Sequence, residues 1–155
     1  MSIYALAFLI GVIAGLRSLT APAVVSWAAR LGWLHLESTW LAFLCSAIVP
    51  YILSVLAIGE LITDKLPKTP SRKTPVPFTG RVLMGALCGA AIGAPSQVLI
   101  GGLLAGAVGA VAGTLSGYEV RTRLVRAIGG KDLPIALLED AIAICGAVWI
   151  VCRFS

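Results

Sequence analysis

An uncharged run from residue 82 to residue 118 constrains this chain more than any other feature. As one α-helix the run would be roughly 55 Å long, whereas the hydrocarbon core of a bilayer is about 30 Å thick. The run must therefore turn back, and Pro95-Ser96-Gln97 is its only polar, helix-breaking point near the middle. The sequence predicts two consecutive, oppositely directed membrane helices over 81–95 and 97–119.

The composition extends this interpretation to the whole chain. Of 155 residues, 59% are hydrophobic and only 12% are charged, and the mean hydropathy is +0.98. A soluble domain carries about 25% charged residues, so an ordinary soluble enzyme, a disordered tail and a disulfide-framed secreted module are excluded. Continuous apolar stretches indicate helices, because the strands of a membrane barrel alternate polar and apolar residues. We expect one integral membrane domain over residues 1–155, an all-α bundle of about five helices, with the other three over 3–30, 40–63 and 134–152.

Positive charge is concentrated in two segments that predict the orientation. Residues 65–81 and 121–131 hold nine of the twelve Lys and Arg residues. The positive-inside rule places both segments in the cytoplasm. Five crossings then put the N-terminus inside and the C-terminus outside. Because the basic residues are divided between two loops beside membrane helices, we do not expect a nucleic acid as a partner.

Small residues recur at every fourth position on the helix expected over 97–119. Residues four apart share a helix face, and glycine there lets another backbone approach closely. Two interpretations remain open, tight packing within one chain and a homo-oligomer. Residues 11–18 can also be aligned with residues 109–116. Because the two helices are expected to run in opposite directions, this pair is a possible inverted repeat, as in many transporters. The small-residue ridge consists of Gly101, Ala105, Gly109, Gly113 and Gly117.

Arg17 is the most informative polar residue, because it lies well inside the first apolar stretch. An arginine at that depth costs about 2.5–3.5 kcal/mol on insertion scales. Pro22 favours a break in the helix, and Ser18 or Thr20 can satisfy a freed backbone group. The positive end of a new half-helix beside a guanidinium suits an anion or a lipid phosphate. The alternatives are a structural salt bridge to another helix and snorkelling to the outer interface.

Few acids could pair with Arg17. Glu60 and Asp64 share one face at the inner end of the second helix, and Glu139 lies beside Asp140 in the first turns of the last helix. Glu119 closes the helix over 97–119. We expect all of them towards the cytoplasm and Arg17 further out, beyond their reach unless the first helix is displaced or unwound. Each acid is interpreted as a structural ion-pair partner or as part of a proton or cation relay.

No catalytic or metal-binding constellation stands out in the sequence, and an intramembrane enzyme is only a distant third interpretation. One histidine, His35, and four dispersed cysteines make no metal site. No nucleophile is paired with a base in a known pattern. We therefore expect no enzyme activity, no cofactor and no metal.

Two motifs carry a resemblance to a known family. Gly15-Leu-Arg-Ser-Leu-Thr-Ala-Pro22 is followed by Gly59-Glu-Leu-Ile-Thr-Asp-Lys-Leu-Pro67, and then by Gly80-Arg81 before a Gly/Ala-rich span. The chain resembles the bacterial membrane proteins grouped as domain of unknown function 4126. The resemblance implies an integral protein of a bacterial inner membrane, with an Arg-containing first helix and an acidic Glu60/Asp64 face, and it implies no activity.

Two hypotheses for the function follow. The first is a transporter or channel for a small anionic solute, with a polar cavity that reaches Arg17. The second is a non-transporting membrane scaffold or lipid-headgroup-binding module, in which Arg17 is sealed in an ion pair. Beyond the lipid bilayer, the expected partners are such a solute or headgroup and a second copy of the chain. The candidate site consists of Arg17, Ser18, Thr20, Glu60, Asp64, Glu119 and Glu139.

Overall fold

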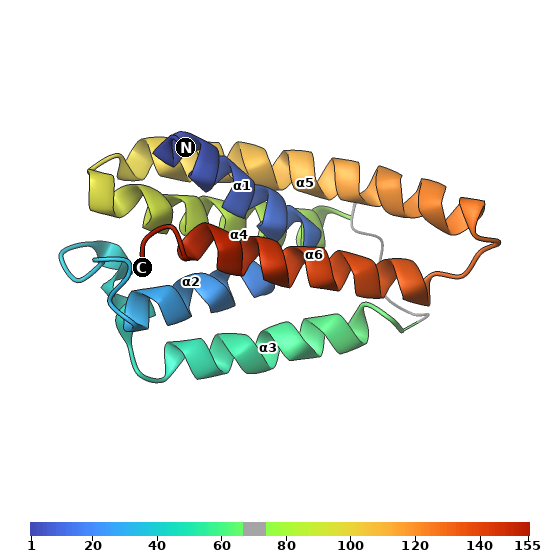
Figure 1. Ribbon diagram of the computed structural model, residues 1–155, viewed down its shortest axis with the longest axis horizontal. Coiled ribbons are helices and arrows are strands. Elements are labelled where there is room, and N and C mark those ends of the chain that lie inside the picture. Colours follow the sequence, from blue (N-terminus) through green and yellow to red (C-terminus); the bar gives the residue numbers. More distant parts are fainter. Residues whose placement is uncertain (67–73) are drawn as a thin grey trace.

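The structure is a computed structural model that describes residues 1–66 and 74–155. Within these residues it contains helices and no strand, which confirms the all-α class (Figure 1). The α-helices are α1 (Ile3–Leu16), α2 (Thr20–Arg30), α3 (Val49–Thr63), α4 (Pro75–Gly93), α5 (Leu99–Ala127) and α6 (Leu133–Val151). Two short 3₁₀ helices are η1 (Trp40–Cys45) and η2 (Ala94–Ser96).

Three of the helices are long and apolar enough to cross a membrane. They cover Pro75–Ser96, Leu99–Ala127 and Leu133–Val151, and α1 and α3 are shorter apolar helices. The predicted reversal near Pro95 is confirmed, because η2 ends at Ser96 and Gln97 follows it in the left-handed conformation, before α5 begins. The helix expected over 81–95 begins earlier, since Pro75 and Pro77 fit the first turn of a helix, where no backbone donor is needed.

The helix expected over 3–30 is wrong, because the chain breaks at Arg17 and reverses. Arg17 is extended (φ −138°, ψ 109°), and α2 runs back along the bundle (Figure 1). The pair α1–α2 is therefore a helical hairpin, in which the start of α1 and the end of α2 lie towards the same end of the bundle. Both chain termini lie at that end, where Met1 and Phe154 line one cavity. The expected placement of the termini on opposite sides is thus not the arrangement of this bundle.

Two further boundaries differ from expectation. The helix expected over 40–63 is divided into η1 and α3. The helix expected over 97–119 continues to Ala127, so part of the basic segment 121–131 is helical. The segment between α2 and α3 is anchored by buried Leu34, Leu36, Leu41 and Leu44. Of the basic segment 65–81, Lys68, Arg72 and Lys73 lie outside the described residues.

Glycines bring α1, α4 and α5 into backbone contact. A Cβ on Gly106 would overlap the carbonyl oxygen of Gly85 in α4, and one on Gly113 would overlap that of Val12 in α1. The glycine faces of α5 are therefore covered within one chain, as the first of the two packing interpretations requires. A homo-oligomer stays a prediction.

The inverted repeat is wrong, because α1 and α5 run parallel. Tyr4 lies beside Gly101 and Gly15 lies beside Thr114, so residue numbers rise together along the two helices. The error follows from the expected five crossings, since the α1–α2 hairpin turns back where a crossing was assumed.

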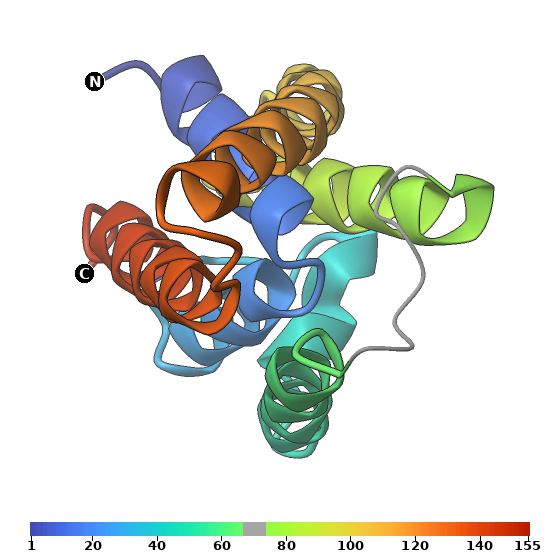
Figure 2. The ribbon, with the colours of Figure 1, turned by 90° about the vertical axis from the view of Figure 1, so that its right-hand side faces the viewer.

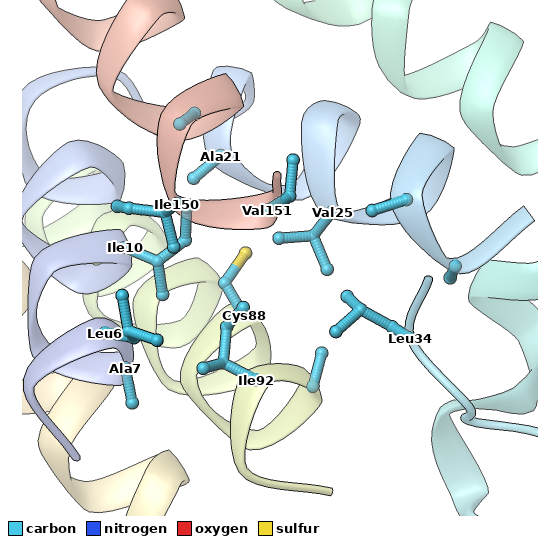
Figure 3. Close-up of a cluster of buried hydrophobic side chains, with 14 of the residues drawn as sticks. Leu6, Ala7, Ile10, Ala21, Val25, Leu34, Cys88, Ile92, Ile150 and Val151 are labelled. Carbon is cyan, nitrogen blue, oxygen red and sulfur yellow. The ribbon is translucent and has the colours of Figure 1, made fainter. Parts of the chain in front are cut away.

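An apolar core of buried side chains holds the α1–α2 hairpin against α4 and α6. Figure 3 shows Ile10 of α1, Val25 of α2, Cys88 of α4 and Ile150 of α6 converging on one cluster. Helix α3 lies outside this cluster at the edge of the bundle, where it packs chiefly on α2 and η1 (Figure 2). Its other face is exposed and apolar, as expected of a lipid-facing helix.

The glycine contacts predict an asymmetric response to added methyl groups. Gly106→Ala should lower the free energy of unfolding by about 1–3 kcal/mol, the usual cost of overpacking. Gly59→Ala is the matched control, because a Cβ there meets nothing within 4 Å. It should leave stability unchanged or raise it by up to about 1 kcal/mol, since alanine is the better helix former. Unfolding in mixed micelles measures both, and equal effects would contradict the packing.

The hairpin predicts that both termini face the same compartment. Reporter domains fused separately to the N-terminus and the C-terminus should give the same compartment signal. A reporter inserted after Gly129, beyond the end of α5, should give the opposite signal. Opposite signals from the two terminal fusions would contradict the hairpin and support the expected five membrane crossings.

Candidate functional site

The site is built at the break between α1 and α2, where two helix ends meet inside the bundle. The last carbonyls of α1 and the first amides of α2 lack partners within their own helices. The α1 end carries partial negative charge and the α2 end partial positive charge. Each end is met by a side chain of opposite charge from another helix.

Glu60 of α3 holds the start of α2. Its Oε1 accepts hydrogen bonds from the Ser18 amide (2.9 Å) and the Ser18 hydroxyl (2.8 Å). Its Oε2 accepts from the Leu19 amide (2.9 Å). Three donors thus converge on one carboxylate, the arrangement by which a helix N-terminus binds an anion. Here the anion is part of the protein.

Arg81 of α4 holds the end of α1. Its Nη1 donates to the carbonyl oxygens of Gly15 and Leu16, each at 2.7 Å. The Thr114 hydroxyl also donates to Gly15, at 3.2 Å. The Arg81 Nη2 lies 3.8 Å from Glu60, so the two charges that hold the break also attract each other. The sequence predicts Arg81 only as an orientation charge at the first residue of the helix over 81–95. Because α4 begins at Pro75, Arg81 instead lies in the second turn of the helix and is buried.

Arg17 lies at the centre of a second set of ion pairs. Its side chain is fully buried and pairs with Asp64 of α3 and Asp140 of α6. The expectation that Arg17 lies beyond reach of the acids is wrong. Reversal of the chain at Arg17 carries the guanidinium to the end of the bundle where α3 ends and α6 begins. Of the alternatives for Arg17, the structural ion pair is the one found.

The ion pairs continue towards the ends of α3 and α5. Lys65 donates to Asp140 at 2.7 Å. Arg121 donates to Asp64 at 2.9 Å and to Glu139 at 3.3 Å, and it also pairs with Asp132. Side-chain exposure rises outward from 0% at Arg17 to 51% at Asp132. We call the eight buried or part-buried residues the charge network. They are Arg17, Lys65, Arg81, Arg121, Glu60, Asp64, Glu139 and Asp140.

The charge network contains four cations and four acids. An isolated charge in an apolar interior is costly, and a balanced set avoids much of that cost. Asp132 adds a further carboxylate, but it is half exposed and solvated.

The predicted site residues are distributed unevenly. Arg17, Ser18, Glu60, Asp64 and Glu139 come together as described above. Thr20 lies next to them as the first residue of α2, and its buried hydroxyl has no hydrogen-bond partner among the described residues. Glu119 is not part of the site, because it lies on the exposed face of α5 and pairs only locally with Arg123. Asp140 is outside the predicted set of site residues, yet it is the partner of both Arg17 and Lys65.

Arg17 is fully buried, and neither of two apolar crevices in this part of the bundle reaches it. One, of about 200 Å³, lies between α1, α5 and α6 and touches Arg121 and Glu139. The other, of about 180 Å³, lies between α2, α3 and α6 and is lined by Thr20 and Trp27. The polar cavity expected at Arg17 is therefore not found in the described part of the chain.

The buried pairs predict strong coupling between Arg17 and Asp140. Arg17→Met and Asp140→Asn should each destabilise the fold by about 3–5 kcal/mol, because each removes one charge from a balanced, buried set and leaves the neighbouring charges with one partner fewer. The double variant should lose clearly less than the sum of the two single effects. Unfolding free energies of a double-mutant cycle measure the difference.

The pair Glu119 and Arg123 is the matched control for that cycle. It is exposed and spaced by four residues on α5, so its coupling should not exceed about 0.5 kcal/mol. Additive effects at Arg17 and Asp140 would contradict the ion pair.

Comparison with known proteins gives a family and no activity. No curated protein matches the chain, and no solved structure matches it. One family pattern matches residues 4–152, which include both helix ends at the break and every member of the charge network. The chain belongs to the family described as domain of unknown function (DUF4126).

Proposed function

We propose that this protein is a transporter for a small anionic solute and that its own Glu60 occupies the anion site in the state described here. The observation that carries the proposal is the carboxylate of Glu60, bound by two backbone amides and one hydroxyl at the start of α2. A site that binds one carboxylate in this way has the donors to bind another anion.

The broken helix supports transport over a purely structural role. Membrane transporters commonly bind their substrates at discontinuous helices, with half-helix N-termini directed at anionic groups. Irregular backbone at membrane depth is tolerated where protein buries it or where it lines a cavity. The hairpin tip at residues 17–19 satisfies this condition through Glu60 and Arg81.

Arg17 has a different role in this proposal from the one expected from sequence. It does not contact the solute, because Asp64 and Asp140 neutralise it in the buried state. It fixes the hairpin tip, and Asp64, Glu139 and Asp140 rearrange with it when the site opens.

The proposal includes an orientation. The ends of α3 and α5 lie together, since Arg121 pairs with Asp64, and both are followed by basic segments. By the positive-inside rule this end faces the cytoplasm of a bacterium, and both termini then lie on the outer side of the inner membrane. The function is solute binding and passage rather than catalysis, and self-association within the membrane is part of the proposal.

One observation favours a second candidate, a lipid-headgroup-binding module or scaffold. Arg17 is sealed, and the apolar crevice beside Arg121 and Glu139 is open to a lipid chain. In that case the charge network only holds the fold, and no solute passes.

Anion uptake into proteoliposomes tests the two candidates. Wild-type protein should accelerate uptake of at least one member of a panel containing chloride, nitrate, phosphate and lactate, relative to protein-free vesicles. Glu60→Gln should change the initial rate at low anion concentration by several-fold, because the competing charge is removed from α2. Glu119→Gln is the matched control and should leave the rate unchanged, since Glu119 lies on the exposed face.

Absence of protein-dependent uptake for every anion, in both wild type and Glu60→Gln, would contradict transport. A phospholipid retained through purification and lost on substitution of Leu138, which lines the crevice beside Arg121, would then support the second candidate.

A further inference from the structure

The crevice beside Arg121 lies where two consecutive helices diverge. Helices α5 and α6 are joined by a short loop over residues 128–132, at the end of the bundle opposite the two chain termini (Figure 1). Helix α5 nevertheless packs chiefly on α1 and α4, and α6 packs chiefly on α2 and α1, so α5 and α6 have few contacts with each other. The space between them is the crevice of about 200 Å³ described above, which we call the α5–α6 crevice.

The α5–α6 crevice is mostly apolar and opens at the surface of the bundle. Val12 and Leu16 of α1 contribute to its lining, and Val120 of α5 and Leu138 of α6 line it while remaining half exposed. Because α5 and α6 are apolar and long enough to cross a membrane, an opening on their outer surface meets hydrocarbon. The occupant that this environment offers is an acyl chain.

The size of the α5–α6 crevice also fits an acyl chain. Its volume equals that of roughly seven water molecules, whereas a helix with its side chains is about 10–12 Å across. Along α5 the crevice extends from Ser116 to Leu124, a rise of roughly 12 Å. A segment of one acyl chain fits this space, and a helix of a second copy does not.

Two cations without an acid partner lie at the loop end of the crevice. Arg126 is in the last turn of α5 and Lys131 is in the loop, and both are exposed. Neither forms an ion pair within the described part of the chain, and residues 67–73 contain no acid. The exposed acids nearby are already neutralised, because Glu119 and Asp132 each pair with an arginine of α5. The loop end of the crevice therefore attracts an anion.

We infer that the α5–α6 crevice binds an anionic phospholipid. One acyl chain lies between Val120 and Leu138, and the phosphate lies at the loop end, where Arg126 and Lys131 neutralise it. Basic residues beside membrane helices attract anionic headgroups, whereas a zwitterionic headgroup brings a cation of its own. The lipid is a resident component of the bundle and not the transported solute, so this inference goes beyond the proposed transport.

Native mass spectrometry of the full-length protein in detergent tests the inference. Titration with dioleoyl phosphatidylglycerol should give one tightly bound lipid per chain. Dioleoyl phosphatidylcholine has the same acyl chains and no net charge, and it should bind about thirtyfold more weakly, the effect of two basic residues at the headgroup. Glycerol phosphate, which has no acyl chain, should not displace the bound phosphatidylglycerol.

Variants near the loop test the headgroup contacts. Arg126→Gln combined with Lys131→Gln should remove most of the preference for phosphatidylglycerol, because both unpaired cations are lost. Glu119→Gln combined with Arg123→Gln is the matched control, because it removes two exposed charges of opposite sign and leaves the net charge unchanged. The control variant should keep the preference of the wild type.

Variants in the crevice test the contacts with the acyl chain. Val120→Trp fills the crevice and should weaken both lipids about tenfold, the effect of about two methylene groups that are no longer buried. Val108→Trp is the matched control, because Val108 is 60% exposed on the same helix and does not line the crevice. Leu138→Trp repeats the test from the α6 side.

Several results would overturn the lipid site. They are equal affinity for the two lipids, several equivalent lipids per chain, displacement by glycerol phosphate, an unchanged preference without Arg126 and Lys131, and unchanged affinity in both Val120→Trp and Leu138→Trp. Anion uptake tests the proposed transport separately. Uptake by a protein that shows none of this lipid binding would leave transport standing, whereas one tightly bound phosphatidylglycerol without any uptake would support the lipid site and overturn transport.

Discussion

The structure depends on how two helix ends are neutralised inside an apolar bundle. At residues 15–19 the last backbone carbonyls of α1 and the backbone amides just before α2 have no partners within these two helices. Arg81 satisfies the carbonyls and Glu60 satisfies the amides, and each charge also suits the dipole of the helix end it meets. Loss of either side chain would leave backbone groups at the reversal without these hydrogen-bond partners, which is costly for buried groups.

The remaining charges follow from that reversal. A hairpin that turns at Arg17 brings a guanidinium to the same level as the end of α3 and the beginning of α6, where Asp64 and Asp140 neutralise it. The close glycine packing of α5 against α1 and α4 then fixes the hairpin beside the helices that cross. Polar contacts at the tip and backbone contacts along the helices thus support one another, and Glu60 and Asp64 attach α3 to the tip.

Much of this arrangement could be predicted from local sequence signals. The uncharged run and Pro95 predicted the α4–α5 reversal, and Arg17 with Pro22 predicted a break. The direction of the chain after Arg17 could not be predicted, because a break has the same local signature whether the helix continues or turns back. That single error moved the N-terminus to the wrong end, inverted α1 relative to α5 and placed Arg17 beyond its acids. Glu119 was selected for its charge alone, whereas its exposure and its pairing with Arg123 depend on which face of α5 is covered.

The central claim is that the Glu60 carboxylate is a ligand of the α2 N-terminus. The amide proton shifts of Ser18 and Leu19, measured by NMR on ¹⁵N-labelled protein in detergent, test it most directly. The account predicts that both resonances lie far downfield, as expected for hydrogen bonds to a carboxylate, and that both move upfield in Glu60→Gln but not in Glu119→Gln. Ordinary shifts that do not respond to Glu60→Gln would contradict it.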